Sequence, residues 1–483
     1  MLFNSVKFVV FFPAVVFLYF ALPHRFRWAL LLAASYYFYM CWKAEYLVLI
    51  IISTAIDYFA ALVIAQTSRK LYRRLLLACS LAGNFGLLFA FKYFNFVNDS
   101  LRAALNHFNI MYDVPALHVL LPVGISFYTF QTVSYTIDVY LGKQQPERHL
   151  GIFALYVSFF PQLVAGPIER PQRLLPQFFE KHSWNKALAI DGLQLMLWGF
   201  FKKIVIADRL AIYVNEVFNH PGAYHGFPVW LAAYFFSIQI YCDFSGYSDI
   251  AVGSAQIMGF RLIENFHQPY FSQNIAEFWR RWHVSLSTWF RDYVFIPLGG
   301  SRTTPLRRMR NIMITFLVSG LWHGANWTFV IWGGLHGLYY VFSQLTQNIR
   351  EIFVKRTGLV HLPTLHRLAQ IIITFHLVTF AYIFFRANGL RDAAVLVQNL
   401  AHFGFTKQAV RVIMTPRDFT AVWVFVIAML IVEWLWQTQK SGSGRSPFAG
   451  RGNRFQWVFY YLVTVCIFIF GKFGSNPFIY FQF

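Results

Sequence analysis

Apolar runs long enough to cross a lipid bilayer recur along the whole chain, and they limit its possible folds more than any other feature. A membrane-spanning helix needs about 20 consecutive, mostly apolar residues. Runs of this kind occur from Val6–Leu22 near one end to Phe455–Phe470 near the other. No polar block between them is long enough to fold separately. The sequence therefore predicts an all-α polytopic membrane protein that forms a single domain, residues 1–483.

The charge distribution fits the same class. Only 13% of the residues are charged, and Lys plus Arg outnumber Asp plus Glu by 41 to 20. Nucleic-acid binding is one interpretation of such an excess, but the basic residues gather in short loops such as Ser68–Arg74 and Pro305–Arg310. Loops of this kind are typical of the cytoplasmic side of a membrane protein. The four cysteines have no paired spacing, so we expect neither a disulfide framework nor a metal site.

We expect roughly a dozen spans of about 20 residues, with the amino terminus outside the cytoplasm. The predicted spans are Val6–Leu22, a run ending near Trp42, Tyr46–Gln66, Leu75–Val97, Val114–Tyr140, Ala187–Phe218, Phe227–Phe260, the runs that flank His323, Ala369–Phe385, Phe419–Gln437 and Phe455–Phe470. Pro122 and Gly124 should interrupt one of them. We interpret 98–113 as an external loop and Phe159–Arg170 as a re-entrant or interfacial element.

A histidine at membrane depth is the first candidate for chemistry. The stretch Ser319–Asn326 (Ser-Gly-Leu-Trp-His-Gly-Ala-Asn) places His323 between two apolar runs. Ionisable side chains are costly inside a bilayer, and those that occur usually face a cavity and serve a function. Gly320 and Gly324 permit close approach of another group and a helix break beside the ring. The alternative is a neutral packing histidine that is hydrogen-bonded to a backbone carbonyl.

Two other segments carry polar groups among apolar ones. The segment 274–293 predicts an amphipathic helix with basic and aromatic faces, lying at the cytoplasmic interface or dipping into the protein, and it contains His283. Asp243 and Asp249 lie within an apolar run, where we favour a role as interhelical hydrogen-bond acceptors. These patterns suit general acid–base chemistry. By themselves they leave a proton-coupled transporter with His323 as a relay open beside an enzyme.

Several motifs, in order along the chain, resemble those of the membrane-bound O-acyltransferases. They are Phe159-Phe-Pro-Gln-Leu-Val-Ala-Gly-Pro-Ile, Tyr241-Cys-Asp-Phe-Ser-Gly-Tyr-Ser-Asp, Asn265-Phe-His-Gln-Pro-Tyr, Phe278-Trp-Arg-Arg-Trp-His-Val-Ser-Leu-Ser-Thr-Trp and Gly320-Leu-Trp-His-Gly-Ala-Asn-Trp. The resemblance is to the bacterial branch that O-acetylates alginate, with the D-alanyl transfer proteins of teichoic acids more distant. It implies a ring of tilted transmembrane helices around a central tunnel, with re-entrant and interfacial helices.

The resemblance also implies roles for particular residues. His323 matches the catalytic histidine of the family and His283 its second, supporting histidine. Trp322 and Asn326 would line the tunnel, and Trp282 and Trp289 are further candidates for substrate binding or for an aromatic belt. The expected donor is cytoplasmic acetyl-CoA, with no bound cofactor. The basic residues Arg280, Arg281 and Arg302 would hold its phosphates, or they act only as topology determinants.

The last residues add a sharper hypothesis. The sequence Phe478-Ile-Tyr-Phe-Gln-Phe483 resembles a carboxyl-terminal motif of teichoic acid D-alanylation, in which a tyrosine is thought to carry the acyl group. Tyr480 would then be a catalytic residue whose phenol is deprotonated by His323 and attacks the thioester. The alternative is an aromatic anchor at the membrane interface.

The sequence thus predicts an O-acetyltransferase of the bacterial inner membrane that serves an exopolysaccharide such as alginate through a periplasmic partner. Peptidoglycan, cellulose and teichoic acid are alternative acceptors. A proton-coupled transporter and a non-catalytic scaffold of an export complex are the alternatives from other classes.

Overall fold

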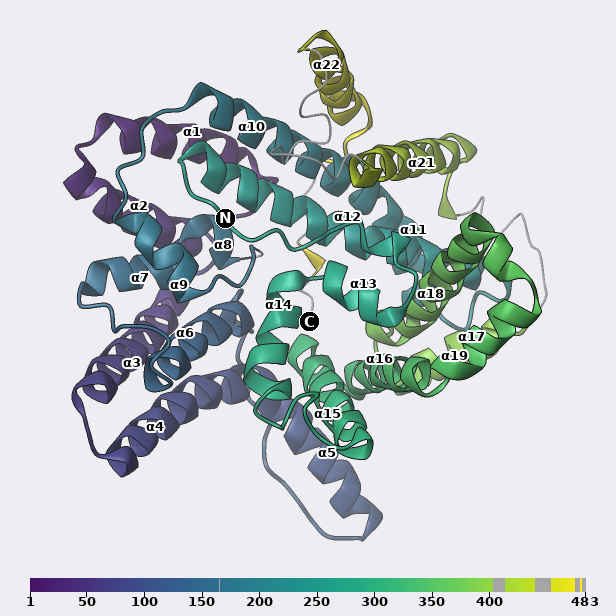
Figure 1. The fold of residues 1–483 in the computed structure, drawn as a ribbon, viewed down its shortest axis with the longest axis horizontal. Coiled ribbons are helices and arrows are strands. Elements are labelled where there is room, and N and C mark those ends of the chain that lie inside the picture. Colours follow the sequence, from purple (N-terminus) through teal and green to yellow (C-terminus); the bar gives the residue numbers. More distant parts are fainter. Residues whose placement is uncertain (165, 403–412, 439–452, 474–477, 480–483) are drawn as a thin grey trace. The chain divides into compact units, whose positions relative to one another are not determined.

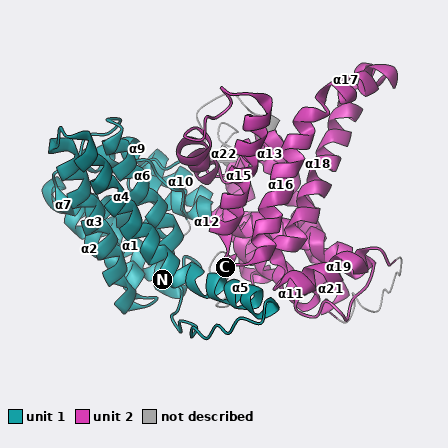
Figure 2. Cartoon of the chain, turned by 90° about the horizontal axis from the view of Figure 1, so that it is seen from below, with its two compact units in different colours: residues 1–196, 248–263, 480–482 teal, residues 197–247, 264–479, 483 magenta. Residues whose placement is uncertain are grey.

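The structure is a computed structural model, and it describes residues 1–164, 166–402, 413–438, 453–473 and 478–479 (Figure 1). All regular elements in these ranges are helices, which confirms the predicted all-α class. The chain divides into two compact units, coloured separately in Figure 2. Unit 1 comprises residues 1–196, 248–263 and 480–482, and unit 2 comprises 197–247, 264–479 and 483.

The amino-terminal helices form most of unit 1. They are α1 (Val6–Ala21), α2 (His24–Met40), α3 (Leu47–Gln66), α4 (Lys70–Leu88), α5 (Phe94–His107), α6 (Ile125–Tyr140), α7 (Leu150–Ser158), α8 (Phe160–Leu163) and α9 (Pro171–Leu174), followed by α10 (Lys186–Phe200). Asp57 on α3 ties three of them together. Its buried carboxylate accepts hydrogen bonds from Asn84 of α4 (2.8 Å), Thr136 of α6 (2.7 Å) and Ser80.

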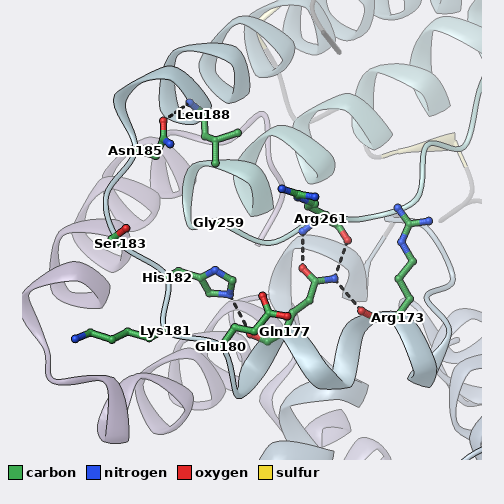
Figure 3. A pocket seen from close by; sticks show the side chains of 10 residues that line it. All are labelled: Arg173, Gln177, Glu180, Lys181, His182, Ser183, Asn185, Leu188, Gly259 and Arg261. Atoms are coloured by element: carbon green, nitrogen blue, oxygen red, sulfur yellow. Dashed lines mark hydrogen bonds between the residues drawn. The ribbon is translucent and has the colours of Figure 1, made fainter. Parts of the chain in front are cut away.

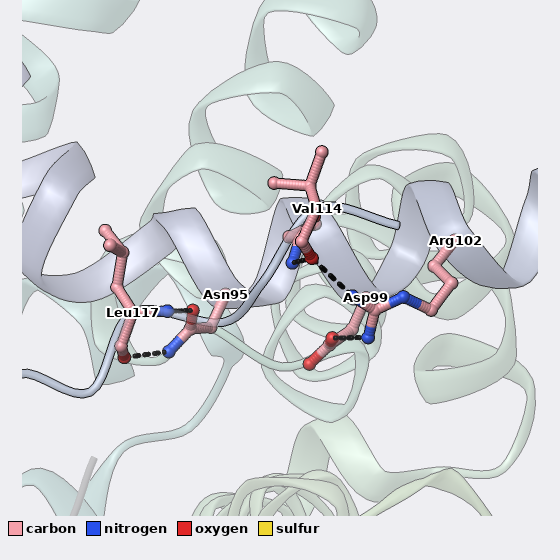
Figure 4. A network of polar contacts seen from close by, with 6 residues as sticks. Asn95, Asp99, Arg102, Val114 and Leu117 are labelled. Atoms are coloured by element: carbon pink, nitrogen blue, oxygen red, sulfur yellow. Dashed lines mark hydrogen bonds and ion pairs between the residues drawn. The ribbon is translucent and has the colours of Figure 1, made fainter. Parts of the chain in front are cut away.

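The predicted external loop 98–113 is wrong in its first part. A π-helical turn, Phe89–Tyr93, continues α4 directly into α5, which ends only at His107. The following extended segment is fastened to α5 by side-chain hydrogen bonds (Figure 4). Asn95 exchanges two bonds with the backbone of Leu117 (2.8 and 2.9 Å), while Asn98 and Arg102 donate to the carbonyl of Val114. Asn98 and Arg102, which belong to the predicted loop, therefore lie on α5 and hold the segment that follows this helix.

The predicted break at Pro122 and Gly124 is confirmed. Helix α6 starts only at Ile125, and Gly124 has a φ of 78°, a conformation that glycine adopts without steric cost. A Cβ at Gly124 would lie 2.7 Å from the carbonyl oxygen of Leu163. The re-entrant element predicted for Phe159–Arg170 contains the four-residue helix α8, which is buried and far too short to cross a bilayer.

The remaining helices belong to unit 2, which also contains the end of α10 and the larger part of α12. They are α11 (Asp208–Asn219), α12 (Phe227–Ile257), α13 (Ile275–Arg281), α14 (Val284–Phe290), α15 (Pro305–His323), α16 (Trp327–Leu345), α17 (Gln347–Arg356), α18 (Pro363–Arg386), α19 (Leu390–Leu400), α21 (Pro416–Thr438) and α22 (Asn453–Phe470). A π-helical turn, Phe201–Ala207, joins α10 to α11.

Fewer helices than the predicted dozen are plainly membrane-spanning by length and composition. Among the described residues, four helical stretches qualify: Ala44–Gln66, Lys70–His107, Pro363–Arg386 and Pro416–Trp436. The shorter apolar helices are Val6–Ala21 and Gln456–Phe470. Among the other predicted spans, α12 carries the buried polar residues Asp243 and Gln239 within its apolar run. The several apolar helices fit a polytopic membrane protein.

Candidate active site

His323 lies at the turn of a helical hairpin. It is the last residue of α15, and Gly324 then takes an extended conformation (φ −160°) before α16 begins at Trp327. The predicted helix break beside the ring is therefore confirmed. Asn326 caps α16, because its side-chain oxygen accepts a hydrogen bond from the backbone N–H of Thr328 at 3.0 Å.

Glycines bring the two arms of this hairpin into direct backbone contact. A Cβ on Gly320 would lie 2.3 Å from the carbonyl oxygen of Phe329, and one on Gly333 would lie 2.3 Å from that of Phe316. Helices approach this closely only where small residues face each other. The crossing fixes the end of α15 against α16 and thereby fixes the backbone that carries His323.

Three aromatic rings surround the imidazole of His323. Its ring centroid lies 4.9 Å from that of Trp322, 4.9 Å from that of Trp332 and 5.4 Å from that of Phe385, with the planes nearly perpendicular in each case. The side chain is only 3% exposed. Rings in this arrangement keep an imidazole in one orientation and exclude water around it.

The segment around His283 differs from the prediction. A single amphipathic helix over 274–293 is wrong: the helix stops at Arg281, α14 starts at Val284, and His283 between them has a φ of 43°. This left-handed conformation is rare for a residue with a Cβ and is associated with functional sites. The side chain of His283 is fully buried, whereas Arg280 in the same segment is exposed, which fits the predicted alternative of a segment that dips into the protein.

A neighbouring segment holds this break in place. The carbonyl oxygen of Asn265 accepts a hydrogen bond from Val284 N at 3.0 Å, and its side-chain oxygen is 3.3 Å from Ser285 N. On the other side of the break, His267 N donates to the carbonyl of Arg281 at 2.9 Å. These bonds satisfy backbone groups that the interrupted helices leave open, and they fix His283 from both sides.

Trp322 brings the two predicted histidines into one cluster. Its ring centroid lies 6.2 Å from that of His283 and 4.9 Å from that of His323. The residues come from different parts of the fold: His283 immediately precedes α14, and Trp322 and His323 end α15 (Figure 1). His283 and His323 are far apart in the sequence, so the sequence alone did not predict their shared contact with Trp322.

The sequence analysis missed a third buried histidine. His336 on α16 is fully buried, and its ring lies 4.9 Å from Trp332, which also packs on His323. Trp279 donates its indole N–H to Nδ1 of His336 at 3.3 Å, so Nδ1 is the acceptor in this contact. The signal was present: His336 is a titratable residue in an apolar run, flanked by glycines as His323 is.

The other predicted binding residues are more scattered. Trp282 is buried against Phe278 and Phe266, at ring distances of 5.5 and 5.0 Å, and Trp289 packs on Phe290 and Tyr293. Both are interior residues rather than members of an interfacial belt. Asn326 is committed to the cap of α16 and to the carbonyl of Asn388, at 3.2 Å.

The predicted cationic residues are not equivalent. Arg281 forms an ion pair with Glu277 one turn earlier on α13, at 2.5 Å, whereas Arg280 and Arg302 are exposed. Exposed guanidinium groups are available to an anionic ligand without breaking an internal contact. Tyr480 lies outside the described residues, as does most of the predicted basic loop 437–454.

Asp243 has a partner that the sequence analysis did not identify. Its Oδ1 atom lies 2.6 Å from Nζ of Lys203, which in turn lies 2.8 Å from Oδ1 of Asp208. Asp243 is therefore one member of a buried ion cluster, beyond the predicted role of an interhelical hydrogen-bond acceptor. Lys203 lies on the π-helical turn, within the predicted span Ala187–Phe218.

Unit 1 contains a separate polar hollow of about 520 Å³ (Figure 3). Its lining includes the cationic residues Arg173, Lys181 and Arg261, together with His182. Gln177 shapes its wall, since the side chain accepts from Arg261 N at 2.7 Å and donates to the carbonyl of Arg261 at 3.0 Å. None of the predicted site residues lines this hollow.

Comparison with known proteins gives a consistent result. Residues 148–385 match the model of the membrane-bound O-acyltransferase family. The match includes His283, His323, His336 and the ion cluster around Lys203.

Individual relatives extend the similarity beyond that region. The chain is 40% identical to a probable alginate O-acetylase of Azotobacter vinelandii over 407 residues, which covers 84% of this chain and 79% of the relative. It is 36% identical to a peptidoglycan O-acetyltransferase of Helicobacter pylori, covering 83% and 80%. A teichoic acid D-alanyltransferase of Bacillus subtilis is 31% identical, covering 54% and 68%.

Proposed function

Since the chain belongs to the membrane-bound O-acyltransferase family and is an acyltransferase, we propose that it moves an acetyl group from cytoplasmic acetyl-CoA across the bacterial inner membrane. The acetyl group then passes to a periplasmic partner, which O-acetylates an exopolysaccharide. The relatives named for alginate O-acetylation cover most of the chain and favour an alginate-like acceptor. A relative named for peptidoglycan is only slightly less similar, so peptidoglycan is the second candidate.

One observation carries the catalytic part of this proposal: the rings of His283 and His323 both contact Trp322 inside a buried aromatic cluster. General-base catalysis depends on a well-oriented imidazole, and exclusion of bulk water strengthens the electrostatic interactions around it. Trp322, Trp332 and Phe385 hold His323 in this way. His283, in its strained conformation beside Trp322, would support the same cluster.

In the proposed reaction His323 is the general base. It takes a proton from a hydroxyl group, whose oxygen then attacks the carbonyl carbon of the thioester. The bond between that carbon and sulfur breaks, the acetyl ester forms, and the departing thiolate takes the proton back from the imidazolium. Such proton transfer contributes typically 10²- to 10⁴-fold to a rate.

We assign the attacking hydroxyl to Tyr480. An aryl ester is an activated carrier, because a phenolate leaves more readily than an alkoxide, and the acetyl group could therefore pass on to the periplasmic partner. The described residues just before it support this assignment. Phe478 and Ile479 are both buried in unit 2, as expected of a segment that belongs to the interior rather than to an interfacial anchor.

The test of His323 is acetyl-CoA cleavage by the purified chain with its periplasmic partner. We expect His323→Ala to lower the rate of thioester cleavage by at least about 10²-fold. His376→Ala is the matched control, because His376 is exposed on α18, and its ring lies against the carbonyl of Ile372 (2.7 Å) and the ring of Tyr234 (5.6 Å) rather than in the candidate site. If His323→Ala retains the wild-type rate, the assignment of the base is wrong. Proton-coupled transport without thioester cleavage would favour the transporter alternative.

The test of Tyr480 is the mass of the intact chain after exposure to acetyl-CoA without the partner. The proposal predicts one added acetyl group on the wild-type chain and none on Tyr480→Phe. An acetyl label that persists in Tyr480→Phe would exclude the tyrosine carrier, while leaving the role of His323 to the cleavage assay.

A further inference from the structure

The described residues of the carboxyl-terminal segment are held in unit 2 through backbone groups, much as a bound peptide would be. Arg209 donates to the carbonyl of Phe470 at 2.6 Å, and the N–H of Lys472 donates to the carbonyl of Ile204 at 2.9 Å. Further along, the N–H of Ile479 donates to Oδ2 of Asp243 at 2.6 Å. The last of these bonds is the one closest in sequence to Tyr480.

The acceptor in that bond is a buried carboxylate whose charge is compensated. Lys203 lies 2.6 Å from Oδ1 of Asp243, and their side chains are 2% and 3% exposed. A buried carboxylate is costly unless it is paired, and the ammonium group of Lys203 supplies the opposite charge at this distance. Oδ2 therefore offers a charged acceptor, which binds a backbone N–H about twice as strongly as a neutral acceptor does.

Side-chain contacts complete the binding site. The ring of Phe478 is fully buried and lies 4.6 Å from the ring of Tyr247 and 5.3 Å from that of Phe244. Phe244 in turn lies 4.6 Å from His283. The ring of Phe244 therefore contacts both Phe478 of the carboxyl-terminal segment and His283 of the candidate active site.

We propose that Asp243, oriented by Lys203, is the anchor of a peptide-binding site whose ligand is the chain's own carboxyl-terminal segment. The anchor fixes the Ile479 amide, and because consecutive Cα atoms are about 3.8 Å apart, it restricts where Tyr480 can lie. Asp243 is thus a positioning residue for the acyl carrier. This last step rests on the proposed function, whereas the anchoring itself does not.

The experiment measures hydrogen–deuterium exchange of the carboxyl-terminal peptide in the full-length chain. Asp243→Asn removes the charge of the acceptor, while Asp208 still pairs with Lys203, so the variant leaves no buried ammonium without a partner. We expect the amide of Ile479 to exchange about tenfold faster, because the neutral oxygen of asparagine accepts its N–H only about half as strongly as the carboxylate does. Peptides from unit 1 should exchange as in the wild type.

Asp208→Asn is the matched control. It removes the other carboxylate of the same lysine, which is equally buried, but it leaves the bond between Asp243 and Ile479 intact. We expect its carboxyl-terminal peptide to keep the wild-type exchange rate. If Asp243→Asn also keeps that rate, or if the two variants increase it equally, Asp243 is not the anchor.

A second readout separates the anchor from the acyl carrier. Acetyl labelling of Tyr480 by acetyl-CoA should fall about tenfold in Asp243→Asn, in step with the lost anchoring. If exchange rises in Asp243→Asn but the wild-type chain takes no label, the anchor stands and the tyrosine carrier is wrong. If labelling is normal while the peptide exchanges freely, the proposed positioning of Tyr480 is wrong.

Discussion

Asn265 fixes the backbone of His283. Its carbonyl and side-chain oxygens accept hydrogen bonds from the two residues that follow the histidine, Val284 and Ser285. These bonds hold the backbone of His283 at a φ of 43°, which is unfavourable for a residue with a Cβ. The orientation of His283 therefore depends on a residue from a different segment of the chain.

The first prediction concerns Asn265. Asn265→Ala should lower the turnover number for acetyl-CoA cleavage about tenfold, because it leaves the buried N–H of Ser285 without its acceptor and allows His283 to move. Asn265→Asp keeps an acceptor oxygen and should restore part of the rate. The Michaelis constant for acetyl-CoA should change little. A large rise in that constant instead would mean that Asn265 contacts the donor.

The second prediction separates the ring of His283 from its backbone. Glycine adopts positive φ without the steric cost that alanine bears there. His283→Gly should therefore unfold at a higher temperature than His283→Ala, with a difference in unfolding free energy of about 1 kcal/mol. Both variants lack the imidazole and should show the same reduced activity. Equal thermal stability of the two would argue against a strained backbone at this position.

The third prediction tests the hairpin that carries His323. Gly320→Ala should destabilise the chain by about 1–3 kcal/mol, because the new Cβ would lie 2.3 Å from the carbonyl oxygen of Phe329. Gly334→Ala on α16 is the control, since its nearest neighbour, a methyl group of Leu317, would be 3.6 Å away. Thermal unfolding in detergent should show a loss for the first variant and no loss for the second.

The fourth prediction distinguishes two adjacent arginines. Arg280→Gln should raise the Michaelis constant for acetyl-CoA about tenfold if this exposed group binds a donor phosphate. Arg281→Gln should mainly lower stability, because Arg281 is already paired with Glu277. Repeating the assay with acetyl-dephospho-CoA shows whether the 3′-phosphate is the group recognised. If Arg280→Gln leaves both constants unchanged, the arginine is a topology determinant only.

Local features of the fold could be predicted from the sequence, but contacts between distant segments could not. The breaks at Gly124 and Gly324 were predictable, since glycine beside a proline or a histidine within an apolar run marks them. The break at His283 was not. Its cause is a pair of hydrogen bonds that Asn265 accepts, and no local signal in the amphipathic pattern reveals them.

The candidate site was predictable in part for the same reason. His283 and His323 were found by their residue type, yet their common neighbour Trp322 became evident only in the structure. Lys203 looked like one of two adjacent lysines in an apolar run, and the partner that explains it, Asp243, lies on another helix. Pairing of this kind depends on how helices pack, which periodicity in one sequence does not encode.

The π-helical turn Phe201–Ala207 has a consequence for length changes in this region. The backbone N–H of Asp208 donates a hydrogen bond to the carbonyl of Lys203, five residues earlier. The two side chains therefore lie on the same face of the helix, and Nζ of Lys203 is 2.8 Å from Oδ1 of Asp208. In an ordinary α-helix, residues five apart point about 140° away from each other. Deleting one amino acid here would restore the regular α-helix, and it would break the ion pair between Lys203 and Asp208. The chain should therefore tolerate substitutions in this turn far better than insertions or deletions.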